Sequence, residues 1–280
     1  MVPPAPPIMP TGDAAHRHRE LAESFGTDAA SYDHARPRYP AALVDAVVER
    51  IRGHTILDVG IGTGISAEPF RDRGLAVLGI DPDPQMARLA RAKGFNVEIA
   101  RFEDWPAAGR TFDAIAAGQA WHWVDPTAGA AKAACLLRPG GVLALFWNAG
   151  RPPAELATGF ATAFDALHTG LPFNPWAALA GADPYGAIID AAAAGLRTTG
   201  AFGAPERLSF KWQATATRDE WLGQAATSGG INRLPKDKRK ALVNSMGAAI
   251  DAAGGNLTID YTTVAAISER LPIRSNVAAE

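Results

Sequence analysis

The most informative part of this sequence is the stretch Thr55-Ile56-Leu57-Asp58-Val59-Gly60-Ile61-Gly62-Thr63-Gly64. Its first half is a short apolar run rich in β-branched residues, which is typical of a strand buried on both faces of a parallel sheet. Glycines then stand at alternate positions, so the backbone can turn and approach a ligand without Cβ clashes. We expect a helix to begin near Ser66 and to direct its unpaired amides at the same spot. The stretch therefore predicts an α/β fold with a nucleoside-binding loop.

A second apolar run, from Leu75 to Ile80, stops at Asp81. In doubly wound folds an acid about 20 residues after the glycine loop accepts hydrogen bonds from both ribose hydroxyls. This spacing does not identify the nucleoside, because residues 62–67 also satisfy the G-x-G-x-x-A fingerprint of dinucleotide-binding folds. A nicotinamide- or flavin-dependent enzyme is therefore a rival interpretation. Asp58 argues against it, since an acid beside the loop disfavours a pyrophosphate and suits the cationic groups of S-adenosylmethionine (SAM).

Four motifs stand in order along residues 57–141. They are Leu57-Asp58-Val59-Gly60-Ile61-Gly62-Thr63-Gly64, Gly79-Ile80-Asp81-Pro82-Asp83, Phe102-Glu103-Asp104-Trp105 and Leu137-Arg138-Pro139-Gly140-Gly141. In this order they resemble the motifs of class I SAM-dependent methyltransferases, and the resemblance is strong from about residue 20 to residue 150. It implies a Rossmann-like α/β fold: a seven-stranded, mostly parallel sheet with an antiparallel last strand and helices on both faces. It also implies SAM as the cofactor and S-adenosylhomocysteine as the product.

The resemblance distributes the cofactor-binding residues along these motifs. Asp104 is expected to accept from the adenine amino group, with Glu103 as the alternative, and the flat indole of Trp105 is suited to flank the ring. Met86 faces adenine in many relatives, although a methionine at helical spacing also suits a helix core. The full predicted set is Gly60, Ile61, Gly62, Thr63, Gly64, Asp81, Pro82, Met86, Glu103, Asp104, Trp105, Gln119, Ala120 and Trp121.

A segment before the glycine loop, residues 25–40, resembles the preamble F-x-x-x-A-x-x-Y-D-x-x-R-P-x-Y-P of many small-molecule methyltransferases. That resemblance implies that Tyr32, Arg36 and Tyr39 cover SAM or hold the substrate. The alternative is structural: the two tyrosines pack this segment onto the core and Arg36 is solvated.

The segment Gly118-Gln119-Ala120-Trp121-His122-Trp123 follows the predicted strand 112–117, at the sheet end where the family presents groups to the reactive methyl. It lacks the N/D-P-P-Y motif of enzymes that methylate nucleobase amines, so a nucleobase substrate is not expected. His122 is the candidate catalytic residue, because an imidazole can remove the proton of an alcohol or phenol, or can hydrogen-bond the substrate. Two alternatives are open: His122 packs and donates to a backbone carbonyl, or the acceptor is a carboxylate that needs no base. Trp121 and Trp123 either enclose the sulfonium by cation-π attraction or anchor a lid.

The composition bounds the class of protein. The 280 residues suffice for one large α/β domain, and 48% hydrophobic with 20% charged residues is ordinary for a globular protein. A formal net charge of -2 gives no electrostatic footprint for nucleic acid. Neither a membrane span nor a signal peptide is recognisable, so the cytoplasm is the expected location. The single cysteine, Cys135, excludes a cysteine-based metal cluster, and no metal is expected.

We interpret the chain as one domain built of five segments. Residues 1–13 are expected to be a disordered tail and residues 14–54 a helical cover. Residues 55–150 form the SAM-binding core, residues 151–203 an insertion that closes over the substrate, and residues 204–280 the completion of the sheet.

These observations predict a SAM-dependent methyltransferase that acts on a small organic molecule, as a monomer or homodimer, with no nucleic-acid or membrane partner. Methylation at oxygen, of a carboxylate or hydroxyl, is the expected reaction. The preamble also resembles the transferases that esterify the carboxylate of malonyl-carrier protein, which makes a carboxyl O-methyltransferase the sharper prediction. An NAD(P)-dependent oxidoreductase and a catalytically idle SAM-binding protein are the alternatives.

Overall fold

The structure, a computed structural model, describes His16, residues 29–168, Asn174, Trp176, residues 185–226, Ile231 and residues 234–272. The predicted tail, residues 1–13, lies outside the described residues. The strands of the sheet are β1 Thr55–Val59, β2 Ala76–Asp81, β3 Asn96–Ile99, β4 Phe112–Gly118, β5 Leu137–Arg151, β6 Glu206–Thr217 and β7 Asn256–Glu269.

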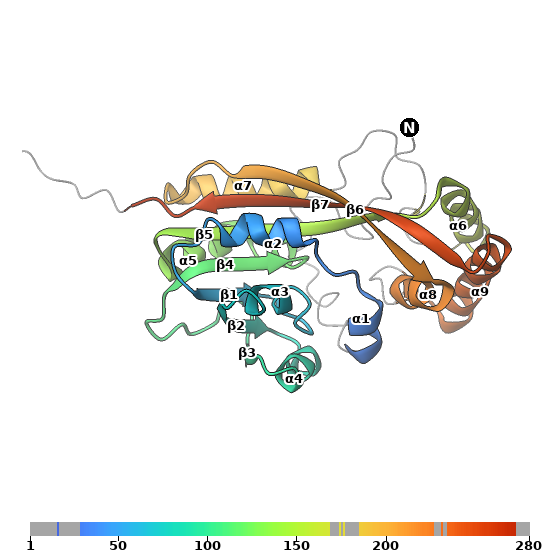
Figure 1. Ribbon diagram of the computed structural model, residues 1–280, viewed down its shortest axis with the longest axis horizontal. Coiled ribbons are helices and arrows are strands. Elements are labelled where there is room, and N and C mark those ends of the chain that lie inside the picture. The colour runs from blue at the N-terminus through green and yellow to red at the C-terminus, as the bar shows by residue number, and fades with distance from the viewer. Residues whose placement is uncertain are drawn as a thin grey trace, which may run out of the picture.

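These strands form one seven-stranded sheet in the order β3-β2-β1-β4-β5-β7-β6 (Figure 1). Strands β1 to β5 are parallel, whereas β7 pairs antiparallel with both β5 and β6. The chain therefore has the predicted Rossmann-like α/β fold with an antiparallel last strand. The order reverses beside β1, between β1 and β4, and open α/β sheets bind ligands at the carboxyl ends of the strands at such a point.

Helices cover both faces of the sheet (Figure 1). One face packs on α2 (Ala41–Val48), α3 (Glu68–Arg71) and α4 (Pro84–Ala92), and the other on α5 (Pro126–Leu136) and α7 (Gly186–Thr199). Neighbouring residues of β1 show the alternation: Ile56 packs in the core beneath α2, and Leu57 in the core beneath α5 and α7. Both side chains are fully buried, as predicted for this strand.

The strands β5, β6 and β7 extend past the parallel strands and carry a second hydrophobic core. Around it pack α6 (Ala154–Ala166), α8 (Arg218–Ala226) and α9 (Lys236–Ala252), with Phe160, Trp221 and Tyr261 at its centre. Figure 1 shows these helices at the far end of the molecule from α5 and α7. The sequence predicts only residues 142–147 as the fifth strand. The observed strand is longer because β7 supplies backbone partners as far as Arg151.

Helix α1 (Ala29–Ala35) lies between the parallel half of the sheet and the second core (Figure 1). It packs against α8 on one side and α4 on the other, yet it has no buried residue. A helix without a buried apolar face gains little from hydrophobic burial, so polar contacts hold α1 in place.

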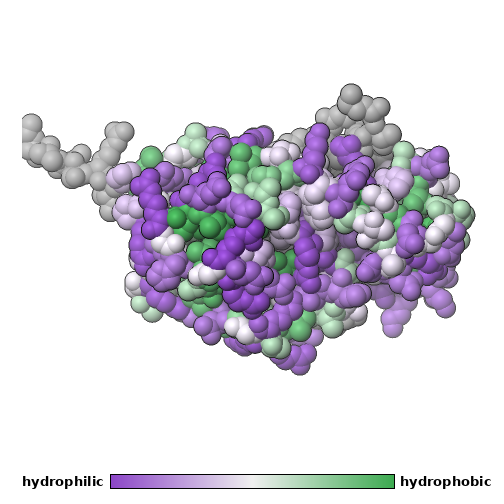
Figure 2. Space-filling model, viewed as in Figure 1, coloured by the Kyte–Doolittle hydropathy of each residue, from purple (hydrophilic) through white to green (hydrophobic). Residues whose placement is uncertain are grey.

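The face of the molecule shown in Figure 2 is largely hydrophilic, and the hydrophobic patches on it are small and interrupted. Among the described residues, no helix combines the length and the apolar character needed to cross a bilayer.

Candidate cofactor and substrate site

The glycine loop leaves the carboxyl end of β1 in a conformation that favours glycine. Gly60, Gly62 and Gly64 have φ angles of 69°, 57° and 94°, in the left-handed region. A Cβ on Gly60 would lie 2.5 Å from the Cβ of Ala120, whereas a Cβ on Gly62 would have no neighbour within 4 Å. The loop is therefore tightly packed at its start and open at its middle, where a ligand can approach the backbone.

The helix after this loop is shorter than the sequence predicts. Helix α3 begins at Glu68, not near Ser66, and has four residues. Ser66 turns inward instead, and its hydroxyl donates to Asp58 Oδ2 at 2.7 Å. A single helical turn provides only a weak terminal dipole, so carboxylates dominate the electrostatics of the loop.

Two buried carboxyl groups flank the loop. Asp81 accepts from the amide of Gly62 through Oδ2 and from the amide of Asp83 through Oδ1, both at 2.8 Å. Burial raises the pKa of Asp81 to about 6 and that of Asp58 to about 7. Asp58 Oδ1 is buried and has no hydrogen-bond partner among the described residues. A ligand that brings a cation to Asp58 and hydroxyl donors to the remaining lone pairs of Asp81 fits this pair.

A polar cluster ties α1 across the glycine loop. Asp33 of α1 accepts from the hydroxyl of Thr63 and from Lys93 Nζ, both at 2.6 Å, and Lys93 also reaches Glu68 at 2.9 Å. Arg38 lies 3.6 Å from Asp33. Burial acts to raise the pKa of Asp33, but the hydrogen bonds from Lys93 and Thr63 outweigh it and lower the pKa. We call these five residues the Asp33 cluster.

The third sequence motif contacts several different parts of the structure. Glu103 accepts from the amide of Asp125 at 2.8 Å, at the start of α5, while Asp104 is exposed. Trp105 is buried in the core, where its indole donates to Glu98 at 2.7 Å. The adenine roles of these residues stay predictions, and Asp104 is the acid whose carboxylate is more open to solvent.

Two further predicted residues lie close to Asp81. Pro82 is half-buried and follows it directly, and Met86 is buried on α4. The carboxylate of Asp83 caps that helix by accepting from the amides of Gln85 and Met86.

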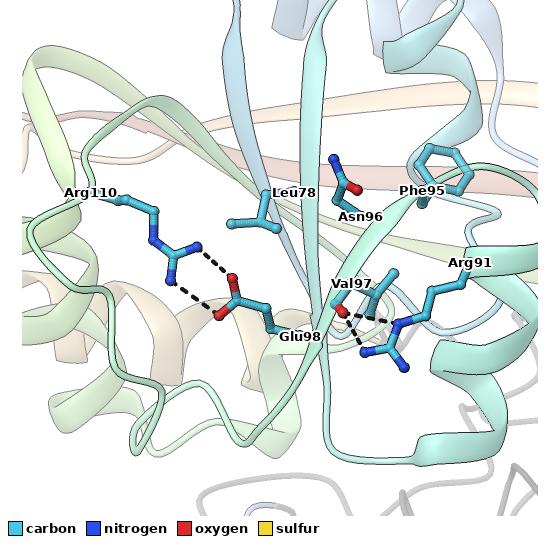
Figure 3. Close-up of a pocket in the computed structure, with 7 residues that line it drawn as sticks. All are labelled: Leu78, Arg91, Phe95, Asn96, Val97, Glu98 and Arg110. Atoms are coloured by element: carbon cyan, nitrogen blue, oxygen red, sulfur yellow. Dashed lines mark hydrogen bonds and ion pairs between the residues drawn. The ribbon is translucent and has the colours of Figure 1, made fainter.

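A pocket lies along the edge strand β3 (Figure 3), and none of the predicted site residues lines it. Figure 3 shows its two arginines turned to protein partners: Arg110 pairs with Glu98, and Arg91 donates to the carbonyl of Val97 at 2.6 and 3.1 Å. Glu98 lies on β3 itself, and a charged side chain on an edge strand discourages pairing with other chains. The pocket is lined by Leu78, Arg91, Phe95, Asn96, Val97, Glu98 and Arg110.

A buried polar network joins the end of β4 to β5, β7 and α7. The amide of the Gln119 side chain donates to the carbonyl of Asn148 at 3.1 Å, and the hydroxyl of Tyr185 donates to the same carbonyl at 2.8 Å. The side chain of Asn148 accepts from Thr263 at 2.6 Å and donates to the carbonyl of Arg38 at 3.1 Å. Gln119 itself has a φ of 54°, which is uncommon for a residue other than glycine and typical of functional turns.

Of the residues predicted to cover the site, Tyr39 lies near the end of β4, and Tyr32 and Arg36 contact each other. The guanidinium of Arg36 lies over the ring of Tyr32, 4.7 Å from its centroid. The hydroxyl of Tyr39 lies 2.8 Å from the position that a Cβ on Gly118 would take, at the end of β4. Burial raises the pKa of Tyr39 well above its usual range and that of Tyr185 to about 12, while the charge of Arg36 acts to lower both. Arg36 therefore lies within electrostatic reach of several phenols at the ligand-binding edge of the sheet.

His122 and Trp121 lie in a short 3-10 helix, η3 (Trp121–Trp123), which two residues separate from the end of β4. His122 is 8% exposed, and its Nδ1 accepts from the indole of Trp147 at 3.2 Å. Trp121 packs in the core against Phe102, with 5.7 Å between ring centroids. The proposed base is thus buried and already hydrogen-bonded at one nitrogen.

Comparison with known proteins relates this chain to methyltransferases. Residues 57–145 match a family model described as a methyltransferase domain. The chain carries a methyltransferase domain. The fold, a mostly parallel sheet with an antiparallel β7, is shared with a provisionally assigned type II methyltransferase from Anaeromyxobacter dehalogenans. The TM-score is 0.58 at 22% identity, over 85% of this chain and 99% of that one.

Two curated relatives extend the similarity of the methyltransferase domain. An uncharacterised methyltransferase of Mycobacterium tuberculosis is 36% identical over 132 residues, which are 46% of this chain and 54% of the relative. A malonyl-[acyl-carrier protein] O-methyltransferase of Pseudescherichia vulneris is 27% identical over 216 residues, 72% of this chain and 86% of the relative. The chain spans about half the length of the mycobacterial relatives that it matches.

The candidate site also includes residues that the sequence alone does not single out. Asn148 had a recognisable signal, because it is a polar residue that ends the apolar run of β5, as Asp81 ends that of β2. Asp33 stands inside the preamble but was not assigned a role. The sequence gives no indication of a functional role for Trp147, since a tryptophan in a buried strand is usually a core residue. The predicted residues that lie together around the loop and the end of β4 are Gly60, Ile61, Gly62, Thr63, Gly64, Asp81, Gln119, Ala120 and Tyr39.

Proposed function

We propose that the protein is a SAM-dependent methyltransferase that methylates an oxygen of a small organic molecule, a carboxylate in particular. The observation that carries the proposal is the pair of buried carboxyl groups on either side of the glycine loop, with Asp58 Oδ1 lacking a partner among the described residues. A buried carboxylate attracts a cation and repels a pyrophosphate. This pair therefore favours SAM over a dinucleotide.

The residues of the chain supply binding, orientation and exclusion of water. When bound, SAM supplies a methyl group on a sulfonium, which an acceptor displaces in line. Asp81 is suited to hold the ribose, Asp58 the cationic end, and α1, held by the Asp33 cluster, to close the site from solvent. Positioning and a dry site are the main contributions that such a displacement requires.

A carboxylate acceptor is supported by the charge at the ligand-binding edge. The charge of Arg36 acts on Tyr39 and Tyr185, so its guanidinium lies within electrostatic reach of both, and a guanidinium recognises a carboxylate through paired hydrogen bonds. The similarity to a relative named for methylation at an oxygen points in the same direction. Arg36 and Tyr39 are accordingly proposed as acceptor-binding residues.

The raised pKa values make cofactor binding depend on pH. In the free protein Asp58 and Asp81 are partly protonated near pH 6 to 7, and a cationic ligand favours their ionised forms. We expect the affinity for SAM to rise between pH 5 and 7, with release of protons on binding, as measured by calorimetry in buffers of different ionisation enthalpy. Asp58→Asn should remove most of the proton release, and an affinity that is constant over this range would contradict the assignment.

The same groups give the free protein the opposite trend in stability. Because their pKa values are higher in the folded than in the unfolded state, the unfolded state binds fewer protons, and the free energy of unfolding falls as the pH rises from about 4 to 7. SAM should offset this loss, so a thermal melt at pH 7 should show a larger ligand-induced rise in Tm than a melt at pH 5.

The Asp33 cluster should make the affinity sensitive to salt. We expect Asp33→Asn to weaken SAM binding about threefold to tenfold, because it removes the ionic contacts that hold α1 over the loop. Raising the ionic strength should weaken the wild-type affinity more than that of the variant. Asp72→Asn is the matched control, since Asp72 is exposed and pairs only with its neighbour Arg71 at 3.9 Å among the described residues. Equal affinities for wild type and Asp33→Asn would show that α1 is no cover.

The activity itself is tested by the formation of S-adenosylhomocysteine. The protein is incubated with SAM and a panel of aliphatic and aromatic carboxylates, phenols and amines, and the product is quantified by mass spectrometry. The proposal predicts acceptor-dependent turnover with at least one carboxylate. Tight SAM binding without turnover of any acceptor would instead support a SAM-binding protein without catalysis.

A further inference from the structure

The hydrogen bond between Trp147 and His122 determines where the imidazole carries its proton. An indole N–H can only donate, so His122 Nδ1 must accept and must be deprotonated. A neutral imidazole with a bare Nδ1 carries its hydrogen on Nε2. His122 is therefore a donor at Nε2, and its only lone pair is occupied by Trp147.

This arrangement opposes a role in proton removal. A base acting at Nε2 would need a lone pair on Nε2, which carries a hydrogen instead. Protonation of Nδ1 would place its N–H group against the indole N–H of Trp147 in a buried contact. Burial lowers the pKa of His122 to about 3, which keeps the ring neutral at physiological pH. The side chain can give a hydrogen bond but cannot take a proton.

The donor at Nε2 is buried and has no acceptor among the described residues. A buried donor without an acceptor is unfavourable, and such groups are expected where a ligand completes the bond. His122 follows β4 by four residues, at the carboxyl edge that also holds Gln119 and Tyr39. A bound ligand at this edge is the natural source of the missing acceptor.

We propose that Trp147 is a positioning residue that fixes His122 as a neutral Nε2–H donor, and that its acceptor is an oxygen of an anionic substrate carboxylate. This inference rests on the proposed function and narrows its substrate class. A carboxylate arrives without a proton to lose: its oxygen lone pair forms the new O–CH3 bond, the C–S bond of the sulfonium breaks, and its electron pair stays on sulfur. A hydroxyl acceptor would release one proton per turnover and would need a base.

The tautomer can be read directly, without any activity. In the full-length protein labelled with 15N at histidine, with S-adenosylhomocysteine present, two-bond 1H–15N correlation at pH 7 should show His122 with a pyridine-like Nδ1 and a protonated Nε2. Trp147→Phe should abolish this single-tautomer pattern. A protonated Nδ1, or an imidazolium at pH 7, in the wild type would overturn the proposal.

The kcat values of His122 variants distinguish a hydrogen-bond donor from a general base. Glutamine can place an N–H near the position of Nε2 but cannot accept the proton, so His122→Gln should keep kcat within about threefold of wild type, while His122→Ala should lose about tenfold. The matched control for Trp147→Phe is Trp221→Phe. It also replaces an indole, but in the second core, where the indole nitrogen has no partner among the described residues. It should leave kcat unchanged. A loss in His122→Gln as large as in His122→Ala would identify a base and contradict the proposal.

Proton release completes the test. With an indicator dye at pH 7, the proposal predicts turnover without proton release. Release of one proton per turnover, with phenols or alcohols as the only acceptors, would overturn the proposal and leave the methyltransferase function standing. A failure of SAM to bind would overturn the proposed function, while the spectrum of His122 would still report its tautomer.

Discussion

Replacing Asp81 with alanine should weaken SAM binding roughly tenfold to hundredfold. The variant would remove the charge-assisted hydrogen bonds that we propose between Asp81 and the ribose, worth about 1.5 to 3 kcal/mol, and a factor of ten in Kd corresponds to about 1.4 kcal/mol. It also removes the acceptor for the amides of Gly62 and Asp83, so the open middle of the glycine loop loses its anchor. Calorimetric titration of wild type and variant with SAM measures the loss.

Two comparisons show whether this loss comes from the ribose contact. Asp81→Asn keeps the shape and one accepting oxygen, and should fall between wild type and Asp81→Ala. S-adenosylhomocysteine has the same ribose but no sulfonium, so its affinity should fall by a similar factor. An unchanged Kd for Asp81→Ala would remove this residue from the site.

The second large effect is expected on stability, from Gly60→Ala. The residue has a φ of 69°, and an added Cβ would meet the Cβ of Ala120 at 2.5 Å. Left-handed backbone costs a residue with a side chain about 1 to 2 kcal/mol, and overpacking adds about 1 to 3 kcal/mol. We expect the free energy of unfolding to fall by about 3 kcal/mol and the Tm by about 6 to 12 °C.

Gly74→Ala is the matched control for this prediction. Gly74 also has a positive φ, 85°, but nothing lies within 4 Å of its added Cβ. Its free energy of unfolding should therefore fall only by the cost of the left-handed backbone, about 1 to 2 kcal/mol. Equal losses in the two variants would mean that the contact between the loop and Ala120 is looser than the structure has it.

The fold could be predicted from the sequence because each strand has a local signal. In β1 and β2 the apolar run, the glycines and the terminal acid all point to the same structure, and the observed strands begin and end within a residue of the prediction. The length of β5 had no such signal. Its extension to Arg151 depends on pairing with β7, more than 100 residues later in the chain, and long-range pairing is not visible in local composition.

The site was less predictable because the role of a side chain depends on its partners. Trp105 has the size and shape to flank an adenine, and it is also buried in the core, where Glu98 accepts from its indole, so its residue type does not decide between the two roles. His122 was recognised as a chemically capable residue, and the indole that decides its protonation lies on another strand. The role of Asp33 depends in the same way on Thr63 and Lys93, which reach it from the loop and from the end of α4.

We propose that the two carboxyl groups beside the glycine loop select a SAM-type cofactor. The most direct test is calorimetric titration of the purified protein with SAM, S-adenosylhomocysteine and NADH in parallel. We expect saturable binding of SAM and S-adenosylhomocysteine and no binding of NADH. Binding of NADH alone would mean that residues 62–67 act as a dinucleotide fingerprint, and would contradict the proposed methyltransferase activity.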